Sequence, residues 1–451
     1  MLSKPVKLAA TATLLLSSSM ALAIPFSSFD PRSMAMGGAG VAVGDASTAP
    51  LFNPALLSMT RDDDHFALVL PTIGVRIADP DKLRDSIDKF QSGNYVNNLQ
   101  TSVDTLNARI ATATSFPTAP NIAAMQTAAA AVGNPTTGTL PAVSTQLATL
   151  SNKPITVDGG VATVIAIPSD TMGAAFYATG TVATGGLFLY KDATTLQTLA
   201  DQTNCLAAAT TQAAMTACAT TYGTNVNFTS NTLQSGINFR GVMLAEMGVA
   251  ISTYNLGYMT WGITPKVVKA ELFDVPINVN NSNQNGIDGK DYLASYSMPN
   301  LDIGIASYDN IGWRTGLVIK NVIPYTLDFK TAPTPGATPV ANGKTLSLKP
   351  LARIGVSHTT SWSTVALDYD VTRNDPAGFE NSTQYLALGA ELNAFDWVQL
   401  RAGYRMDMAD SARNVTSVGL GLSPFGIPHI DIAVAGNASE VGASFQFGVH
   451  F

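Results

Sequence analysis

The sequence ends in Gly442-Ala-Ser-Phe-Gln-Phe-Gly-Val-His-Phe451, a stretch in which apolar and polar side chains alternate without a break. The apolar face consists of Ala443, Phe445, Phe447, Val449 and Phe451. The opposite face consists of Ser444, Gln446, Gly448 and His450. Strict alternation predicts a β-strand with one apolar and one polar face. Because termini in water usually fray, an apolar face that reaches the last residue suits a strand whose outer side is lipid.

The first residues of the chain are typical of an exported protein. Lys4 and Lys7 precede an apolar run, and Ala21-Leu22-Ala23 has the small-residue pattern of a cleavage site. We therefore expect residues 1–23 to be a secretory signal peptide. Its removal changes the formal charge from −7 to about −9, because two lysines are lost. The mature chain has no basic stripe, so no direct binding to nucleic acid is expected.

Charged residues make up only 13% of the chain, and no stretch after the signal peptide is apolar for long enough to form a transmembrane helix. Two architectures fit an exported chain of this kind. One is a secreted soluble β-protein. The other is a transmembrane β-barrel, which pairs every backbone group within the membrane.

The alternation at the C-terminus recurs along the second half of the chain, for example at Val365 to Val371 and at Val398 to Met406. Charged side chains occupy the face opposite the apolar one, as at Asp368, Asp370 and Arg401. This arrangement is typical of an outer-membrane barrel, and a soluble sandwich would seldom place so many charges on those faces.

Short turns alternate with long loops, as in outer-membrane barrels whose N- and C-termini both lie on the periplasmic side. The pattern predicts an all-β transmembrane fold, an antiparallel barrel of about 14 strands. The predicted strands are 65–78, 160–168, 172–190, 236–253, 258–275, 291–308, 313–330, 346–359, 362–373, 383–392, 397–406, 415–423, 429–435 and 442–451. The last strand should pair with the first, with Phe445 and Phe447 toward lipid and Gln446 toward the lumen.

Two outer loops, 81–157 and 191–235, are long and rich in alanine, threonine and leucine. Leu99, Val103, Leu106 and Ile110 have helical spacing, and the first loop is expected to form two or three helices separated by prolines. Cys205 and Cys218 lie in the second loop. An exported protein favours a disulfide between them, which would staple a helical loop that caps the barrel. Two buried free thiols are the alternative.

A glycine-rich segment precedes the first strand: Asp30-Pro-Arg-Ser-Met-Ala-Met-Gly-Gly-Ala-Gly-Val-Ala-Val-Gly-Asp45, followed by Ala49-Pro-Leu-Phe-Asn-Pro-Ala-Leu-Leu57. It lacks the third glycine and the preceding strand of a nucleotide-binding motif. We expect residues 24–60 to lie in the lumen of a barrel formed by 61–451, because irregular backbone at membrane depth must be surrounded by protein.

These residues resemble the start of the FadL-type outer-membrane proteins, and more closely a branch known as conjugal transfer protein TraF. Asn53-Pro-Ala-Leu-Leu57, Leu70 to Pro80 and Asp85 to Phe90 are similar to the pattern of that branch. The resemblance implies a 14-stranded barrel with an N-terminal hatch, whose movement lets an apolar compound leave sideways into the membrane. The hatch would include Met36, Gly37, Gly38, Gly40, Gly44, Asn53, Pro54 and Ala55. A segment that merely fills space is the alternative.

The terminal phenylalanine also resembles the assembly signal of outer-membrane barrels. It implies that Phe445, Phe447, Val449 and Phe451 are read by the barrel-assembly machinery in the bacterial outer membrane.

Other candidate sites are weak. Asn281 to Gly286 resembles a calcium loop but has Tyr292 where a glutamate is needed. Arg61 to His65 suits a solvated rim better than a metal site. The four histidines lack zinc spacing, although His429 and His450 lie on the last two strands and could approach each other. The pattern shows no nucleophile elbow and no Ser–His pair, so no enzyme activity, metal or cofactor is expected.

Two functions remain open. The first is passive transport or binding of a small, hydrophobic compound. The second is a structural or interaction role in a conjugation or secretion apparatus, suggested by the long helical loops, which transport alone does not require.

Overall fold

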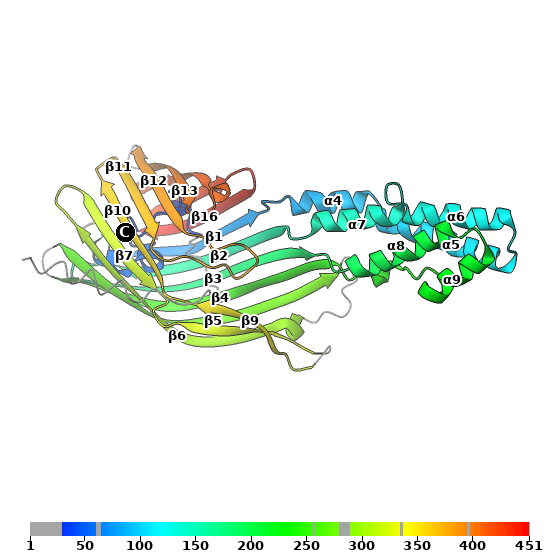
Figure 1. The fold of residues 1–451 in the computed structure, drawn as a ribbon. Helices are drawn as coiled ribbons and strands as arrows, with labels where there is room; N and C mark the ends of the chain where they lie inside the picture. The colour runs from blue at the N-terminus through cyan, green and yellow to red at the C-terminus, as the bar shows by residue number, and fades with distance from the viewer. Residues whose placement is uncertain are drawn as a thin grey trace, which may run out of the picture.

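A computed structural model describes residues 29–59, 65–255, 258–278, 289–333, 337–394 and 397–450. The signal peptide, the turn at 281–286, residues 61–64 and Phe451 lie outside these ranges. Fourteen of the described strands form one closed antiparallel barrel, which confirms the predicted fold class (Figure 1). These strands are β1 Ala67–Ala78, β2 Pro154–Ile167, β3 Met172–Leu189, β4 Gly236–Asn255, β5 Met259–Asn278, β6 Leu293–Tyr308, β7 Trp313–Lys320, β10 Leu351–Thr359, β11 Ser363–Asp370, β12 Tyr385–Ala394, β13 Val398–Asp407, β14 Val415–Leu422, β15 Pro428–Gly436 and β16 Glu440–His450.

The barrel closes between its first and last strands, as the sequence predicts. β1 pairs with β16 from Ala67 opposite His450 to Ala78 opposite Glu440. Phe445 and Phe447 are 44% and 38% exposed on the outside, whereas Gln446 is buried in the lumen. The alternating face of the last strand therefore separates lipid from lumen.

The barrel is apolar outside and charged inside. Exposed apolar side chains such as Val418, Ile432 and Val434 cover the outer wall, while Asp368 and Arg401 are buried in the lumen. All four tryptophans of the chain, Trp261, Trp313, Trp362 and Trp397, are exposed beside the short turns. They form the aromatic girdle expected at one membrane interface. A closed barrel of this polarity resides in the bacterial outer membrane, with lipid around its wall.

Two predicted strands are wrong. The strands predicted at 313–330 and 346–359 each divide in two, because Asn321 has a φ of +54° and because Pro324 and Pro350 cannot donate a backbone hydrogen bond. The extra strands, β8 Tyr325–Thr331 and β9 Val340–Leu348, form a separate hairpin, so part of the predicted loop 331–345 is strand.

The β8–β9 hairpin folds into the barrel. Its buried side chains pack against the inner faces of β4, β5 and β6. The hairpin side chains in this cluster are Leu327, Phe329, Leu346 and Leu348. The Tyr325 hydroxyl also donates to the carbonyl of Pro299, at 2.9 Å. The hairpin therefore narrows the lumen along one side.

The first long loop forms four helices rather than two or three: α4 Leu83–Ser92, α5 Tyr95–Ser115, α6 Ala119–Gly133 and α7 Thr139–Leu150. Pro120 and Pro141 do not separate helices, because they lie in first turns, where proline is tolerated. The additional helix is α4, which is separated from α5 at Asn94, a residue with a φ of +48°. Since β2 begins at Pro154, the insertion ends before residue 157.

The second long loop adds α8 Ala193–Ala208 and α9 Gln212–Tyr222. A disulfide joins Cys205 on α8 to Cys218 on α9, with their Cα atoms 5.9 Å apart. These helices share one apolar core with α4 to α7. We call residues 83–150 and 193–233 the helical arm. None of the helices within the described ranges is long and apolar enough to cross a membrane.

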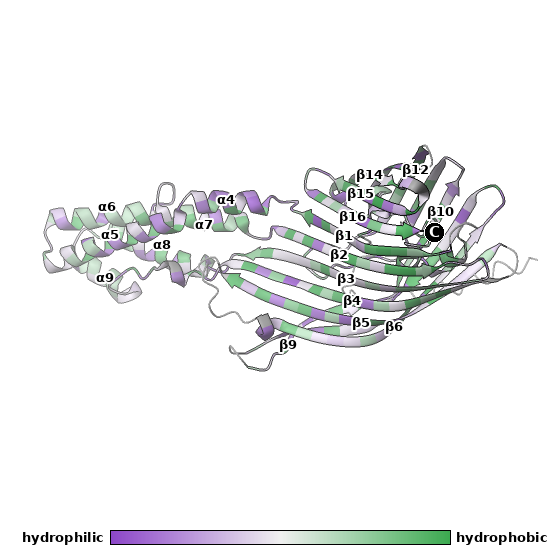
Figure 2. Cartoon of the chain, turned by 180° about the vertical axis from the view of Figure 1, so that it is seen from behind, coloured by the Kyte–Doolittle hydropathy of each residue, from purple (hydrophilic) through white to green (hydrophobic). Residues whose placement is uncertain are grey.

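The helical arm does not cap the barrel, contrary to the prediction. Figures 1 and 2 show that it projects from one end of the barrel. Helices α4 to α7 connect β1 to β2, and α8 and α9 connect β3 to β4. The arm therefore extends from the ends of these four neighbouring strands. The short elements are α2 Pro31–Ala35, α3 Ala49–Phe52 and the 3₁₀ turns η2 Pro54–Ser58, η3 Ser230–Thr232, η4 Gly289–Tyr292, η5 Ser411–Arg413 and η6 Pro424–Gly426.

Candidate functional site: a luminal segment and its cavities

Residues 29–59 lie inside the barrel, and we call them the luminal segment. It consists of α2, α3 and η2, and most of its side chains are buried. Phe52, Leu56 and Leu57 pack with Val164 and Ala250 on the inner barrel wall. The residues predicted to form the hatch all belong to this segment. Whether the segment moves remains a prediction.

Glycines on both sides allow the segment to seat on the wall at β12 and β13. Gly37 has a φ of +70°, which favours glycine. A Cβ added to Gly403 would lie 2.1 Å from the Gly37 nitrogen, and one added to Gly389 would lie 2.5 Å from the Met36 Cβ. The backbone of the segment therefore rests directly on a wall without side chains. Gly38, with a φ of +99°, continues the same turn.

The second half of the segment sits against β5, β6 and β7. The Asn53 side chain donates to the carbonyls of Val41 and Ile305, at 3.1 and 3.2 Å, and accepts from the Ala55 nitrogen. A Cβ added to Gly304 would lie only 2.0 Å from the Asn53 Oδ1. Asn53 therefore ties the segment both to itself and to the wall.

Pro54 and Ala55 complete this contact. A Cβ added to Gly262 would lie 2.6 Å from both the Pro54 carbonyl carbon and the Ala55 nitrogen. Within the segment, Gly40 and Gly44 are required as well, because added Cβ atoms would reach the Phe52 ring at 2.3 Å and Leu56 at 2.9 Å.

An ion-pair cluster also fixes the segment to the wall at β12 and β13. The Arg32 guanidinium donates twice to the Glu391 carboxylate, at 2.9 and 3.0 Å, and once to Asp45, at 3.0 Å. Glu391 also accepts from Arg401 at 2.7 Å, and Arg401 pairs with Asp431. We call these five residues the luminal ion cluster. Paired charges of this kind tolerate burial that single charges do not.

The pKa values of Asp45 and Arg32 in the luminal segment are shifted by their partners in this cluster. Burial alone would raise the pKa of Asp45, but Arg32, together with His450 and two hydroxyl hydrogen bonds, outweighs that effect and holds the pKa below its ordinary value. Burial alone would lower the pKa of Arg32, but Glu391 and Asp45 raise it above its ordinary value. Both groups therefore stay charged at neutral pH.

A second polar contact holds the glycine turn. The Asp368 carboxylate accepts from the backbone nitrogens of Gly40 and Val41, at 2.8 and 2.9 Å. Arg353 donates to the carbonyl of Gly38 at 3.2 Å and pairs with Asp370 at 2.6 Å. The lumen-facing charges therefore bind the backbone of the segment.

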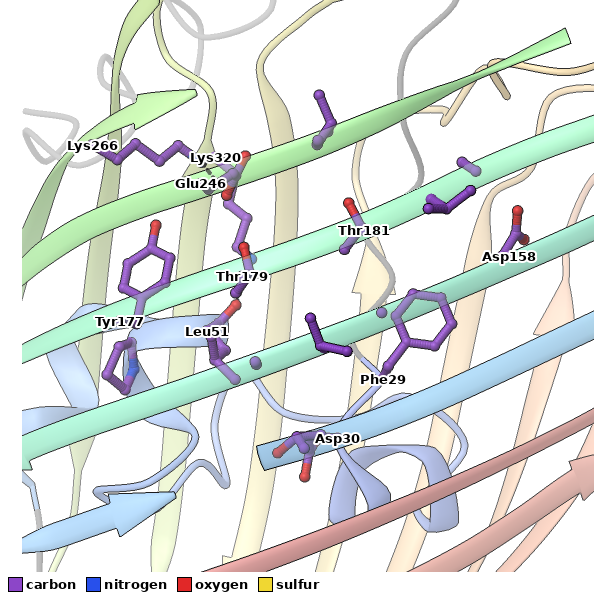
Figure 3. A pocket seen from close by; sticks show the side chains of 18 of the residues that line it. Phe29, Asp30, Leu51, Asp158, Tyr177, Thr179, Thr181, Glu246, Lys266 and Lys320 are labelled. Atoms are coloured by element: carbon purple, nitrogen blue, oxygen red, sulfur yellow. Dashed lines mark hydrogen bonds and ion pairs between the residues drawn. The ribbon is translucent and has the colours of Figure 1, made fainter. Parts of the chain in front are cut away.

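A cavity of about 110 Å³ lies beside the segment (Figure 3). Phe29, Leu51 and Leu244 give it apolar walls, and Tyr177 adds an aromatic one. Its charged end holds Lys266, Glu246 and Lys320. Lys266 pairs with Glu246 at 3.2 Å and with Asp302 at 3.0 Å, and Lys320 donates to the carbonyl of Leu51. We call it the main cavity.

The Phe29 ring lies against two paired glycines of the wall. Gly74 on β1 pairs with Gly160 on β2, and Cβ atoms there would lie 2.7 Å from the Phe29 Cβ and 2.2 Å from its ring. A second cavity, of about 80 Å³, also reaches Phe29. On the lipid side of the same glycines, a groove of about 490 Å³ runs past Gly159, Val161 and Gly180.

Residues 50–370 match the family described as "F plasmid transfer operon, TraF, protein". The chain belongs to this family. The match confirms the resemblance to the TraF branch. No curated protein matches the chain in sequence.

Solved structures resemble this TraF-family chain at low identity. The toluene transporter TbuX of Ralstonia pickettii is 13% identical, with a TM-score of 0.49 over 94% of this chain and 99% of that one. A FadL homologue from Pseudomonas aeruginosa is 11% identical, with a TM-score of 0.49 over 96% and 99%. The toluene transporter TodX of Pseudomonas putida is 11% identical, with a TM-score of 0.46 over 95% and 99%.

On the side of the short turns, the lumen of the TraF-family barrel opens into a polar vestibule of about 370 Å³. Its walls include the luminal ion cluster and the amides of Asn393, Gln399 and Gln446. His429 and His450 meet there, with ring centroids 4.3 Å apart. The vestibule favours water over apolar compounds.

The structure also brings together a serine and a histidine that the sequence did not indicate as a pair. The Ser423 hydroxyl lies 2.7 Å from Nδ1 of His429. Because these residues are six apart and flank a turn, the spacing Ser-x₅-His at a strand end was the available signal. Ser423 is buried and also donates to Gln399 at 3.3 Å. Within the described ranges, no group of three His, Cys, Asp or Glu residues could hold a metal ion.

Proposed function

We propose that this barrel lets a small apolar compound cross the outer membrane through the main cavity and leave through the wall at Gly74 and Gly160. The observation that carries the proposal is the position of Phe29, which fills the glycine notch between the main cavity and the outer groove. The luminal segment acts as a hatch, because its movement withdraws Phe29 from the notch.

The chemistry of the two exits supports a sideways path. The vestibule toward the periplasm is lined by charges and amides, and an apolar compound gains nothing by entering it. The outer groove is lined instead by apolar side chains such as Ile73, Val161 and Val182, with one ion pair, Lys269–Glu271, on its border. Transfer into lipid through the groove keeps the compound in apolar surroundings.

Uptake of toluene by cells that produce the protein tests this proposal. Gly159 faces the groove, and a Cβ there would meet only the Gly74 carbonyl oxygen, at 3.5 Å. Gly159→Val therefore narrows the groove beside Gly74 and Gly160 without disturbing the fold, and we expect uptake to fall severalfold, because the valine side chain occupies part of the exit path. Ala402→Val, on the lipid face of β13, is the matched control. Equal uptake by both variants, or free passage of small sugars, would contradict the proposal.

A second candidate role is that of a structural component of a DNA-transfer or secretion apparatus. It is supported by membership of the TraF family and by the helical arm, which projects beyond the barrel and carries its own core and disulfide. Replacing 83–150 and 193–233 with short turns distinguishes the roles. Loss of plasmid transfer between cells with normal toluene uptake would favour the apparatus. The reverse result would favour transport.

A further inference from the structure

The lumen is crossed, on the side of the helical arm, by the loop that joins β11 to β12. We call residues 374–383 the crossing loop. Asn374 and Thr383 exchange two backbone hydrogen bonds, at 2.8 and 2.7 Å. The Asn374 side chain also donates to Asp370 at 2.8 Å. The base of the loop is therefore fixed to the wall. Arg413 also donates to the carbonyls of Asn381 and Ser382, at 2.8 and 3.1 Å, so the part that can form a flap is the tip before Asn381.

The tip of the crossing loop reaches the opposite wall. In the order of the barrel, β12 and β3 are seven strands apart, which is half of the circle of fourteen. A Cβ on Gly378 would lie 2.8 Å from the nitrogen of Gly185 on β3, and one on Gly185 would lie 3.0 Å from the nitrogen of Phe379. Backbone touches backbone there only because both residues are glycine.

The tip is held by the buried methyl group of Ala377, which packs in the cluster of the β8–β9 hairpin, and by two larger side chains. The Phe379 ring lies 4.5 Å from the Arg240 guanidinium of β4, and the Glu380 carboxylate lies 3.4 Å from Arg76 of β1. Each contact is of a modest kind, because a cation–π pair contributes about 0.5–2 kcal/mol and a 3.4 Å ion pair is not tight. Arg76 keeps a closer partner in Asp158, at 2.8 Å, whether or not Glu380 is present.

The loop covers the cavities. Glu380 forms part of the wall of the 80 Å³ cavity, and Asp158 borders both this cavity and the main one. Beside the loop, the β8–β9 hairpin fills the lumen against β4, β5 and β6. A compound that arrives from outside the cell meets the crossing loop before it meets Phe29.

We propose that the crossing loop is an outer gate, whose tip swings away from Gly185 to admit a small apolar compound to the main cavity. The nature of the compound rests on the function proposed above, but the gating of the cavity does not. The base at Asn374 and Thr383 stays bonded, and the weak contacts of Phe379 and Glu380 break. The barrel thus has two closures in series, with the cavities between them.

The gate is tested by the accessibility of one cysteine in the main cavity. Thr179 lines this cavity and faces it in Figure 3. In intact cells, a membrane-impermeant maleimide should label Thr179→Cys slowly, because the crossing loop covers it. Replacing 376–381 by two glycines should raise the rate at least tenfold, which is about 1.4 kcal/mol of closure. The native cysteines do not interfere, since they form a disulfide.

A pair of point substitutions gives a second, independent measurement. Phe379→Ala with Glu380→Ala removes the tip contacts of both larger side chains without shortening the chain, and should raise the labelling rate of Thr179→Cys severalfold. Thr112→Cys, exposed on the helical arm, is the control and should be labelled rapidly in every background. Equal rates at Thr179→Cys with and without the tip contacts would overturn the gate. Faster labelling without a change in toluene uptake would keep the gate and reject the transport proposal.

Discussion

The attachment of the luminal segment to the barrel depends most on Arg32, and Arg32→Ala is the sharpest test of it. This guanidinium bridges Glu391 of the wall and Asp45 of the segment, and it donates to the carbonyl of Val43 at 3.0 Å. Its removal leaves the strands unchanged, because α2 lies inside the barrel and contributes no residue to it. We therefore expect the segment to loosen while the barrel stays folded.

The free energy of docking lost in Arg32→Ala depends on the contacts that Glu391 and Asp45 retain. Breaking a buried ion pair costs about 3–5 kcal/mol when the remaining charge has no other partner. Glu391 keeps Arg401 at 2.7 Å, and Asp45 keeps the hydroxyls of Ser47 and Thr48. Asp45 is also one-third exposed, which weakens its share of the effect. The loss should lie near the lower limit, at roughly 3 kcal/mol, or about a hundredfold in the docking equilibrium.

Cysteine labelling measures this equilibrium. Ala39 is 1% exposed in the docked segment, so Ala39→Cys reacts with a maleimide only after the segment leaves its seat. In the purified protein, Arg32→Ala should raise the labelling rate about a hundredfold, in step with the docking equilibrium. The control is Arg109→Ala, an exposed arginine of the helical arm. A rate within threefold of the control would refute the ion cluster as the main attachment.

Three further outcomes are expected. Gly403→Ala should release the segment and raise the Ala39→Cys labelling rate, because the added Cβ would lie 2.1 Å from the Gly37 nitrogen. Gly442→Ala is the control and should leave this rate unchanged, because the nearest atom to its added Cβ is 3.3 Å away. Cys205→Ser should destabilise the helical arm by about 3 kcal/mol, so that proteinase K cleaves the arm while the heat-dependent gel shift of the barrel is unchanged; an equally resistant arm would argue against a stabilising role. Deletion of Phe451 should lower the amount of assembled barrel rather than its transport rate, and near-normal barrel levels would show that the last residue is not an assembly signal.

The barrel could be predicted from sequence because its signal is local. The side chains of each strand alternate between lipid and lumen. The directions in which Val365 and Asp368 point can therefore be predicted without knowing which strands pair. The same rule failed at β8, where Leu327 and Phe329 alternate as a membrane strand does but face the inner wall of the barrel. Alternation reports that one face is apolar, and does not report whether lipid or protein covers it.

The contacts of the luminal segment could not be predicted in the same way. Arg32 and Glu391 are 359 residues apart, and their meeting depends on the stagger of fourteen strands. The sequence did contain a partial signal. Gly389 and Gly403 lie on the lumen-facing side of their strands, next to the charges Glu391 and Arg401. A run of glycines on that face indicates that backbone approaches the wall there.

The luminal ion cluster fits the movement proposed for the luminal segment. Without the segment, the wall presents Glu391, Arg401 and Asp431, which carry one net negative charge. The segment adds both Arg32 and Asp45, so docking leaves the net charge unchanged but gives Glu391 a second cationic partner. Arg32 is the one arginine or lysine among residues 29–59, so its pairing with Glu391 selects the register of the segment. The cluster borders the polar vestibule, where water can solvate Glu391 once Arg32 departs. Release therefore costs less than it would in a dry interior, and the apolar contact of Phe29 with Gly74 and Gly160 is lost in the same movement. The ionic attachment lies beside water and the Phe29 contact lies beside lipid, and this arrangement makes the two roles proposed for the segment, closure and release, compatible in one chain.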